Sequence, residues 1–303
     1  MASERPGAPG GPPGGAIVDA HQHVWDVSAH PQPWLASDEA LAPLRRKFAV
    51  ADLAPHAAAE GVTASVVVQT VAESWETPEL LALAADGRLV TGVVGWVDLT
   101  APDIADVLAG QFPQPGGGHL AAIRHPVLIE PDPDWLVRPA VLRGLAAVAA
   151  AGLAYDVVGE PRHLPAAADA AGRLPQLSFV LDHLGNPDLT ASPRASEPWA
   201  STFSRLAALP NVTAKLSGIL SEPPRPGAGS LAHLWPYYDT ALAGFGPGRL
   251  MFGSDWPVST LGASYAQVCA AARALTAGLS PAEREAIFSG TARRIYALGQ
   301  VGR

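Results

Sequence analysis

The sequence predicts a single-domain α/β protein, a (β/α)8 barrel of the TIM type spanning residues 16–303. Short runs rich in Val, Ile and Leu alternate with Ala- and Leu-rich segments, which is typical of parallel strands joined by helices. Eight such runs lie between residues 16 and 253, and eight βα units are the number that closes a barrel. Polar side chains follow several runs, at the positions where barrel enzymes carry their active sites. An open, doubly wound sheet is the alternative.

The eight predicted strands are short and mainly apolar, as expected of strands buried on both faces. In chain order they are Ala16–His21, Ser65–Val71, Val90–Val97, Leu120–Arg124, Leu153–Val158, Ser178–Asp182, Val212–Leu216 and Leu250–Gly253. The segments between them are long enough for the crossover connection that a parallel strand pair requires.

The closing helix has a clear start signal. Ser280 can cap it, Pro281 suits the first helical position, and Glu283 stands where a capping box places an acid. Its apolar residues are expected to cover the outside of the barrel. They are Ile287, Ala292, Ile295, Tyr296 and Leu298.

The composition indicates that this protein binds a small molecule. Hydrophobic residues make up 48% and charged residues 16% of the chain, enough for a large core, and a net charge of −8 gives no footprint for nucleic acid or an anionic membrane. No apolar run reaches the ~18 residues of a membrane span. Oligomeric state stays open.

The N-terminal segment and the single cysteine predict a cytoplasmic protein. Residues 1–15 are rich in Pro and Gly and lack the apolar core of a secretory signal, so we expect a disordered tail. Cys269 is the one cysteine and lies in an apolar helical run, so it forms no internal disulfide and suits a reducing compartment.

Two histidines end the first predicted strand, in the motif VDAHQHVW. Because side chains alternate along a strand, His21 and His23 should project to the same side, toward the barrel mouth. Two imidazoles placed in this way can bind one metal ion. The alternative is a pair of structural histidines. It is disfavoured because the pair follows a barrel strand, where barrel enzymes carry their active sites.

Two further strand ends carry reactive groups. FVLDHLGNP places His183 after the sixth strand, with Asp182 one residue out of phase and therefore expected to point outward. RLMFGSDWPV places Asp255 after the eighth strand, which neighbours the first strand in a closed barrel. A carboxylate beside imidazoles is suited to activating water, as a metal ligand or a base.

The remaining candidates would bind substrate or stabilise an oxyanion. Arg124 and His125 end the fourth strand, Tyr155 lies in the fifth, and Lys215, one of two lysines, lies in the seventh. Surface ion pairing is the alternative for these residues. Aromatic residues in the loops after the first and seventh strands could wall a pocket or simply pack on the barrel: Trp34, Trp235, Tyr237 and Tyr238.

Common nucleotide, nucleophile and redox motifs are missing from the sequence. It contains no Walker loop, no GxGxxG after a strand, no GxSxG elbow and no CxxC pair. This argues against nucleotide binding, α/β-hydrolase chemistry and a thiol redox role.

With these motifs in place, the chain resembles the amidohydrolase superfamily, in the branch that contains L-fuconolactonase and L-rhamnonolactonase, with 2-pyrone-4,6-dicarboxylate lactonase as a relative. The likeness runs from about Ile17 to Leu298 and rests on six motifs, VDAHQHVW, IRHPVLIEPDPDWL, LDHLGNP, NVTAKLSGI, RLMFGSDWPV and AIFSGTARRIYAL. Together they are specific to this branch, although each alone is not.

The resemblance implies hydrolysis of a lactone, with one Zn or Mn ion held by His21, His23, His183 and Asp255, or catalysis without a metal. It implies Asp255 as general base, with His183, Arg124 and His125 acting on the carbonyl and Lys215, Tyr155 and Trp34 contacting substrate. Many superfamily members place a ligand on the fourth and fifth strands, where this chain has Arg124/His125 and Tyr155, so a binuclear centre is not expected. Asn186 stands where a Lys is expected.

Two rivals remain at this stage. The same superfamily supports metal-dependent decarboxylation of aromatic or unsaturated acids with similar ligands. A barrel kept only as a binding or scaffold protein is the non-enzymatic alternative, and it predicts that changing Asp255 leaves activity and ligand affinity untouched.

Overall fold

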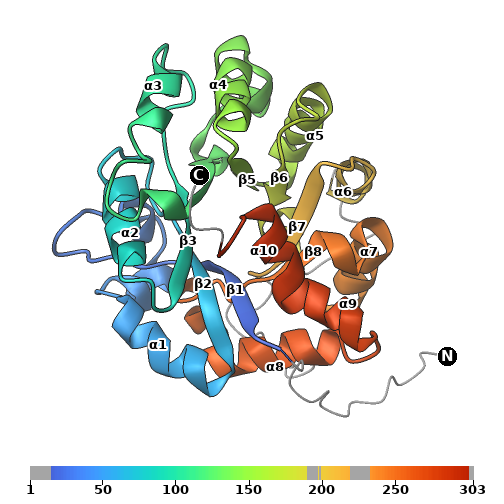
Figure 1. Ribbon diagram of the computed structural model, residues 1–303. Coiled ribbons are helices and arrows are strands. Elements are labelled where there is room, and N and C mark those ends of the chain that lie inside the picture. Colours follow the sequence, from blue (N-terminus) through green and yellow to red (C-terminus); the bar gives the residue numbers. More distant parts are fainter. Residues whose placement is uncertain (1–14, 190–196, 198, 219–232, 300–303) are drawn as a thin grey trace.

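The computed structural model describes residues 15–189, 197, 199–218 and 233–299. Eight parallel strands pair in chain order, from β1 next to β2 through to β7 next to β8, and helices surround them (Figure 1). The ends of β1 and β8 are joined by hydrogen bonds, from the Asp255 amide to the His21 carbonyl (2.8 Å) and from the His23 amide to the Trp256 carbonyl (2.7 Å). The predicted (β/α)8 barrel is therefore confirmed, and the doubly wound alternative is wrong.

The predicted strands are all present, with ends that differ by up to three residues. They are β1 (Ile17–Gln22), β2 (Val62–Val68), β3 (Val90–Gly95), β4 (Leu120–Pro126), β5 (Ala154–Val158), β6 (Phe179–Leu181), β7 (Val212–Leu216) and β8 (Leu250–Phe252). The largest shift is in β2, which begins directly after Gly61. The φ of 74° at Gly61 turns the chain straight from helix into strand.

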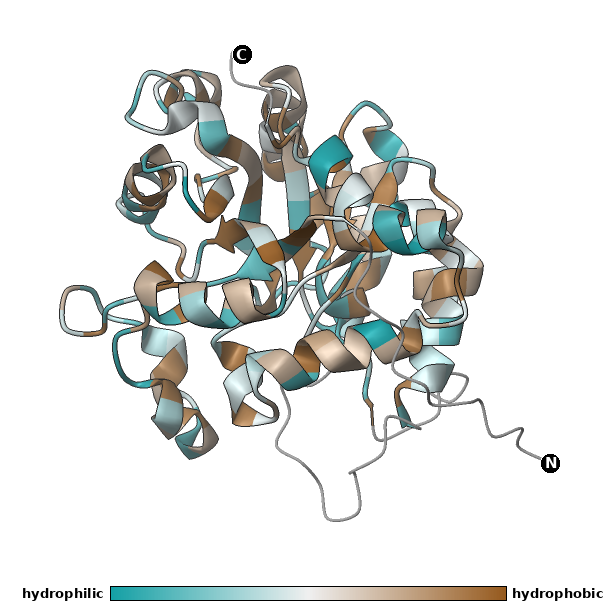
Figure 2. Ribbon diagram, turned by 60° about the horizontal axis from the view of Figure 1, so that its bottom comes forward, coloured by the Kyte–Doolittle hydropathy of each residue, from teal (hydrophilic) through white to brown (hydrophobic). Residues whose placement is uncertain are grey.

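The α-helices follow the strands and cover the outside of the barrel. They are α1 (Val50–Ala59), α2 (Glu76–Ala85), α3 (Ile104–Ala109), α4 (Pro139–Ala150), α5 (Leu164–Arg173), α6 (Trp199–Ala207), α7 (Trp235–Phe245), α8 (Tyr265–Leu275), α9 (Pro281–Glu285) and α10 (Thr291–Ile295). In Figure 2 the central strands carry mainly hydrophobic residues, while the surrounding helices alternate hydrophobic and hydrophilic positions. This pattern places one large core between strands and helices.

The closing helix is capped as predicted but packs differently. Ser280 and Glu283 form the capping box, yet α9 and α10 are separated by a π-helical turn over Ala286–Gly290. The expectation that the end of this segment covers the outside is wrong: Tyr296 and Leu298 lie in the cluster that fills the inside of the barrel. Gly92 leaves room for them, because a Cβ there would lie 2.6 Å from Leu298.

Three remaining sequence expectations concern the cysteine, membrane spans and the N-terminal tail. Cys269 is a free, buried cysteine, as predicted. No helix in the described part of the chain is long and apolar enough to cross a membrane. The predicted tail lies outside the described residues except for Gly15.

Candidate active site

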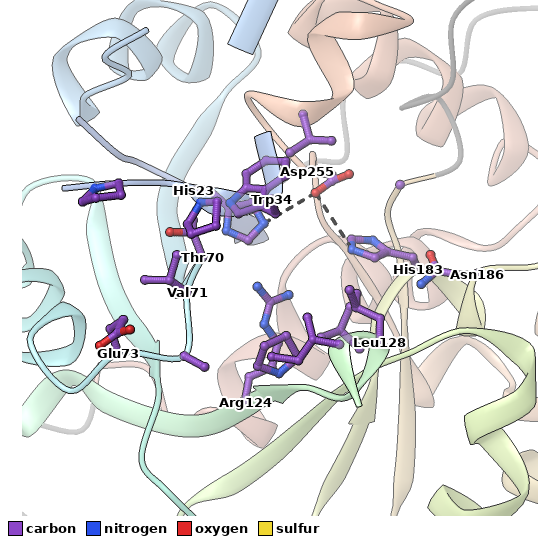
Figure 3. A pocket seen from close by; sticks show the side chains of 18 of the residues that line it. His23, Trp34, Thr70, Val71, Glu73, Arg124, Leu128, His183, Asn186 and Asp255 are labelled. Carbon is purple, nitrogen blue, oxygen red and sulfur yellow. Dashed lines mark ion pairs between the residues drawn. The ribbon is translucent and has the colours of Figure 1, made fainter. Parts of the chain in front are cut away.

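Four side chains from the ends of β1, β6 and β8 meet at one point of the barrel mouth: His21, His23, His183 and Asp255. Figure 3 shows three of them, His23, His183 and Asp255. The Asp255 Oδ1 atom lies 3.8 Å from His21 Nε2, 3.7 Å from His23 Nε2 and 3.9 Å from His183 Nε2. The two β1 histidines lie closer still, with 3.1 Å between their Nε2 atoms. The sequence motifs predicted this convergence of three imidazoles and one carboxylate.

A bulge in β1 aims His21 into the barrel. Val18 and Ala20 face the barrel interior, so strict alternation would turn His21 outward, with Asp19. Three residues of β1 advance against two of β2 between Asp19 and Gln22, which shifts the register by one. Such an extra residue re-aims the side chains that follow it. His21 and His23 therefore do share one side, for a reason that simple alternation does not give.

His183 and Asp255 sit on backbone that few side chains adopt. Their φ angles are 54° and 58°, in the left-handed region that non-glycine residues occupy rarely and mostly at functional sites. Gly218 leaves space for the His183 ring, because a Cβ at Gly218 would lie 2.7 Å from His183 Nδ1. The Ser217 hydroxyl lies 2.9 Å from the same nitrogen and fixes the ring.

The surroundings keep Asp255 ionised and the β1 histidines neutral. Burial opposes the charged form of Asp255, but the electrostatic effect of the surrounding imidazoles of His183, His23 and His21 outweighs it and holds the pKa of Asp255 well below the usual value. Burial lowers the pKa of both His21 and His23, and the Lys215 charge adds to the effect at His21. Neutral imidazoles beside a carboxylate are available both as metal ligands and as proton acceptors.

A fully buried ionic network supports His21 from inside the barrel. The Lys215 ammonium lies 3.1 Å from His21 Nδ1, 2.6 Å from Asp156 Oδ2 and 3.0 Å from Asp182 Oδ1. Tyr296 donates to Asp156 from the C-terminal segment below, at 2.8 Å from Oδ2. The network thus connects the end of the chain to the rim of the site.

Asp182 belongs to this network, and the expectation that it points outward is wrong. It is fully buried and lies 3.0 Å from Arg124 Nη1 as well as 3.0 Å from Lys215. Although burial would raise the pKa of Asp182, Lys215, His21 and Arg124 hold it well below the usual value. The reason is phase: Asp182 follows Val180, which faces the barrel interior, by two residues.

A further buried carboxylate, that of Asp19, was not predicted. It accepts hydrogen bonds from the Ser254 amide (2.8 Å) and the Tyr265 hydroxyl (3.1 Å), and so fixes the turn that carries Asp255. Burial raises the pKa of Asp19 to about 6, although these hydrogen bonds lower it. An acid inside an apolar strand, as in VDAH and AYDVV, was the sequence signal for both Asp19 and Asp156.

A cavity of about 760 Å³ opens above the cluster. His23, His183, Asp255, Arg124 and Trp34 line it, so two of the residues predicted to meet substrate, Arg124 and Trp34, do face the cavity. Its size is that of a small-molecule pocket. The candidate catalytic groups, a positive charge and an aromatic wall therefore surround one open cavity.

Residues 18–298 match the model of the amidohydrolase family. The chain belongs to that family. It is 40% identical to an L-fucono-1,5-lactonase of Burkholderia multivorans, over 94% of this chain and 97% of the relative. It is 36% identical to an L-fucono-1,5-lactonase of Burkholderia ambifaria, over 92% and 94% respectively. This amidohydrolase is accordingly an enzyme, a hydrolase, and the scaffold-protein alternative is set aside.

Solved structures agree on the architecture. A crystal structure of an amidohydrolase from Burkholderia multivorans with bound zinc superposes on this amidohydrolase with a TM-score of 0.86 and 37% identity, over 94% of this chain and all of that one. A 2,6-dihydroxybenzoate decarboxylase from Rhizobium matches with a TM-score of 0.63 at 13% identity. The decarboxylase likeness shows the fold alone.

The donor set of this amidohydrolase fits one divalent metal ion. His21, His183 and Asp255 each offer one ligand atom, all within 4.8 Å of one another. His23 Nδ1 lies 2.8 Å from the Val68 carbonyl, so it donates its proton there and leaves Nε2 free for a metal. Tetrahedral ligands at ~2.0–2.1 Å from zinc lie ~3.3 Å apart, near the 3.1 Å between the β1 histidines.

Three predicted substrate or catalytic residues do not reach the cavity. His125 accepts from Trp96 (3.1 Å), donates to Glu130 (2.8 Å) and stacks on Trp135, so both ring nitrogens are already used. Tyr155 is fully buried in the core of this amidohydrolase. Lys215 is also fully buried and acts behind His21.

Of the four aromatic residues predicted to wall a pocket, one lines the cavity and three do not. Trp34 lines the cavity, whereas Tyr237 and Tyr238 are buried in α7 and Trp235 packs beside Tyr238. Residues 219–232 of the loop after β7 lie outside the described residues.

Proposed function

We propose that this amidohydrolase hydrolyses a lactone, with Asp255 as general base. The observation that carries the proposal is the Asp255 carboxylate, which is held ionised among three imidazoles at the floor of a small-molecule cavity. The lactonases of the two Burkholderia species support it, since they match nearly the whole chain.

The chemistry follows from the positions of the side chains. Asp255 takes a proton from a water molecule, whose oxygen then bonds to the lactone carbonyl carbon. As the ring C–O bond breaks, the proton passes from Asp255 to the departing ring oxygen, and a hydroxy acid is released. The Nη1 atom of Arg124 carries a second N–H besides the one donated to Asp182, so Arg124 can donate to the carbonyl oxygen as negative charge develops on it.

His183 has two tasks in this scheme. Ser217 holds its Nδ1 and so turns its Nε2 toward Asp255, 3.9 Å away, where the ring stabilises the ionised carboxylate. Its place in the cavity wall also brings it next to the substrate.

We further propose that His21, His23, His183 and Asp255 hold one ion, zinc by preference. When bound, a divalent ion would supply Lewis-acid polarisation at this point. The zinc-bound amidohydrolase from Burkholderia multivorans supports this choice. Lys215 and Asp182 would support this ligand set indirectly, because both lie next to His21 Nδ1 and fix the His21 ring.

An assay on purified protein tests the function. We expect a pH-indicator assay to detect acid release from L-fucono-1,5-lactone or a related lactone, and an ultraviolet assay to detect no decarboxylation of 2,6-dihydroxybenzoate. The metal-loaded protein is used for both assays. Decarboxylation without activity on any lactone would overturn the proposal.

The cytoplasm is the compartment we propose for this enzyme. The support is the one cysteine, Cys269, which is free and buried and so suits a reducing compartment.

A further inference from the structure

Gln69 follows β2 directly and does not line the cavity, yet its fully buried side chain lies against Arg124, which does. The backbone of Gln69 is fixed, because its amide donates to the Val94 carbonyl of β3 at 2.9 Å. A buried side-chain amide needs hydrogen-bond partners within the protein. The amide nitrogen and the amide oxygen of Gln69 both pair with Arg124.

The Gln69 side chain connects the backbone of Arg124 to its guanidinium. Gln69 Nε2 donates to the Arg124 carbonyl at 2.9 Å, and Gln69 Oε1 accepts from Arg124 Nη2 at 3.3 Å. The backbone carbonyl of Gln69 accepts from the same Nη2 atom. Both N–H groups of Nη2 are therefore directed at Gln69, which sets the direction of the Arg124 side chain relative to its own backbone.

The rest of the Arg124 guanidinium has one further partner in the described part of the chain. Nη1 donates to Asp182 Oδ2 at 3.0 Å, whereas Nε is buried with no hydrogen-bond partner among the described residues. Because a guanidinium is planar, the contacts at Nη1 and Nη2 together fix the direction of the remaining Nη1 N–H. In Figure 3 the Arg124 guanidinium points toward the side of the cavity on which Asp255 and His183 lie. Without Gln69, Asp182 alone would hold the guanidinium, and a single contact does not fix its plane.

We propose that Gln69 is a positioning residue, which aims the remaining Nη1 N–H of Arg124 at the lactone carbonyl oxygen and does not touch the substrate itself. The proposal rests on lactone hydrolysis as the proposed function and on the place of Arg124 in it. A donor stabilises developing charge most effectively when it is already in position before the reaction. A displacement of about 1 Å, caused by a change outside the reacting groups, can lower the rate about 10²-fold.

A double-mutant cycle tests whether Gln69 acts through Arg124. The substrate is L-fucono-1,5-lactone, or the related lactone that the metal-loaded wild-type protein hydrolyses fastest. Gln69→Met removes both amide contacts at similar length, and it should lower kcat about tenfold with KM within about twofold, because the charge on the carbonyl oxygen develops after binding. Arg124→Met should lower kcat about 10²-fold. The protein with both substitutions should lie within about twofold of Arg124→Met alone, as expected of two residues that act as a unit.

Two further variants separate this role from a contribution to folding. Gln111→Met makes the same substitution at a half-buried glutamine just after α3, which does not line the cavity, and it should leave kcat and KM unchanged. Gln69→Asn keeps a polar amide but is one methylene shorter, which draws its oxygen away from Arg124 Nη2. It should therefore also lower kcat, with a smaller effect on folding than Gln69→Met. The thermal midpoint of each variant is measured, so that kcat is compared between folded proteins.

The outcomes separate this inference from the function on which it rests. A wild-type kcat in the folded Gln69 variants, or a loss of the same factor whether or not Arg124 is present, would show that Gln69 does not act through Arg124. Either result would overturn the positioning role and leave lactone hydrolysis standing. Inactivity of the metal-loaded wild-type protein on every lactone tested would instead remove the proposed function.

Discussion

Replacing Asp255 by Asn is expected to lower kcat for lactone hydrolysis about 10²–10⁴-fold, the range that a positioned general base contributes. Asn keeps the shape of the side chain but cannot accept the proton of water, and it removes the negative charge that His183, His21 and His23 surround. The measurement is steady-state kinetics at saturating lactone, with wild-type and variant protein loaded with metal in the same way.

The matched control for Asp255→Asn is Asp38→Asn, which lies on the exposed surface and should leave kcat unchanged. The thermal midpoint of Asp255→Asn is measured alongside, so that a lost fold is distinguished from lost chemistry. An Asp255→Asn protein that is folded and retains wild-type kcat would contradict the role of this carboxylate.

The second large effect is on stability and concerns the two lysines of the chain. Lys215→Met is expected to lower the free energy of unfolding by about 3–5 kcal/mol, because it leaves the fully buried carboxylates of Asp156 and Asp182 short of their common cation. Lys47→Met removes an exposed pair with Asp26 and should cost about 0–1 kcal/mol. Urea unfolding followed by circular dichroism measures both.

The two variants can be compared directly, because the substitution is the same and the two lysines differ in burial. Lys47 is 66% exposed at its side chain, whereas Lys215 is 0% exposed. Similar losses for the two variants would show that the buried network does not hold the barrel together in the way described. Lys215→Met should also lower lactone turnover, since Lys215 contacts His21, and Lys47→Met should not.

The sequence was sufficient for the barrel and for the four residues of the cluster. HQH, DH and SD each directly follow an apolar run, and in a parallel barrel the carboxyl ends of all strands open onto one face. His21, His23, His183 and Asp255 could therefore be placed together without knowing any distance.

The surroundings of the cluster could not be derived in this way. The bulge in β1 depends on pairing with β2, and a one-residue change of register reverses every side chain after it. From the sequence, Lys215 is interpreted as a surface or substrate-binding residue, because lysine is almost never fully buried without partners. Its partners are far away in the sequence: Asp156 lies in β5 and Asp182 directly follows β6. His125 lies at the end of a strand, where catalytic residues are found, yet both of its ring nitrogens are hydrogen-bonded, to Trp96 and to Glu130.

The position of a bound metal tests the central claim most directly: that distant strand ends build one single-ion hydrolytic centre. A crystal of the zinc-loaded protein, measured on both sides of the zinc absorption edge, should show one anomalous peak per chain, within ~2.0–2.2 Å of ligand atoms from His21, His23, His183 and Asp255. A peak elsewhere, or a fully active protein with no zinc or other ion at this point, would contradict the account.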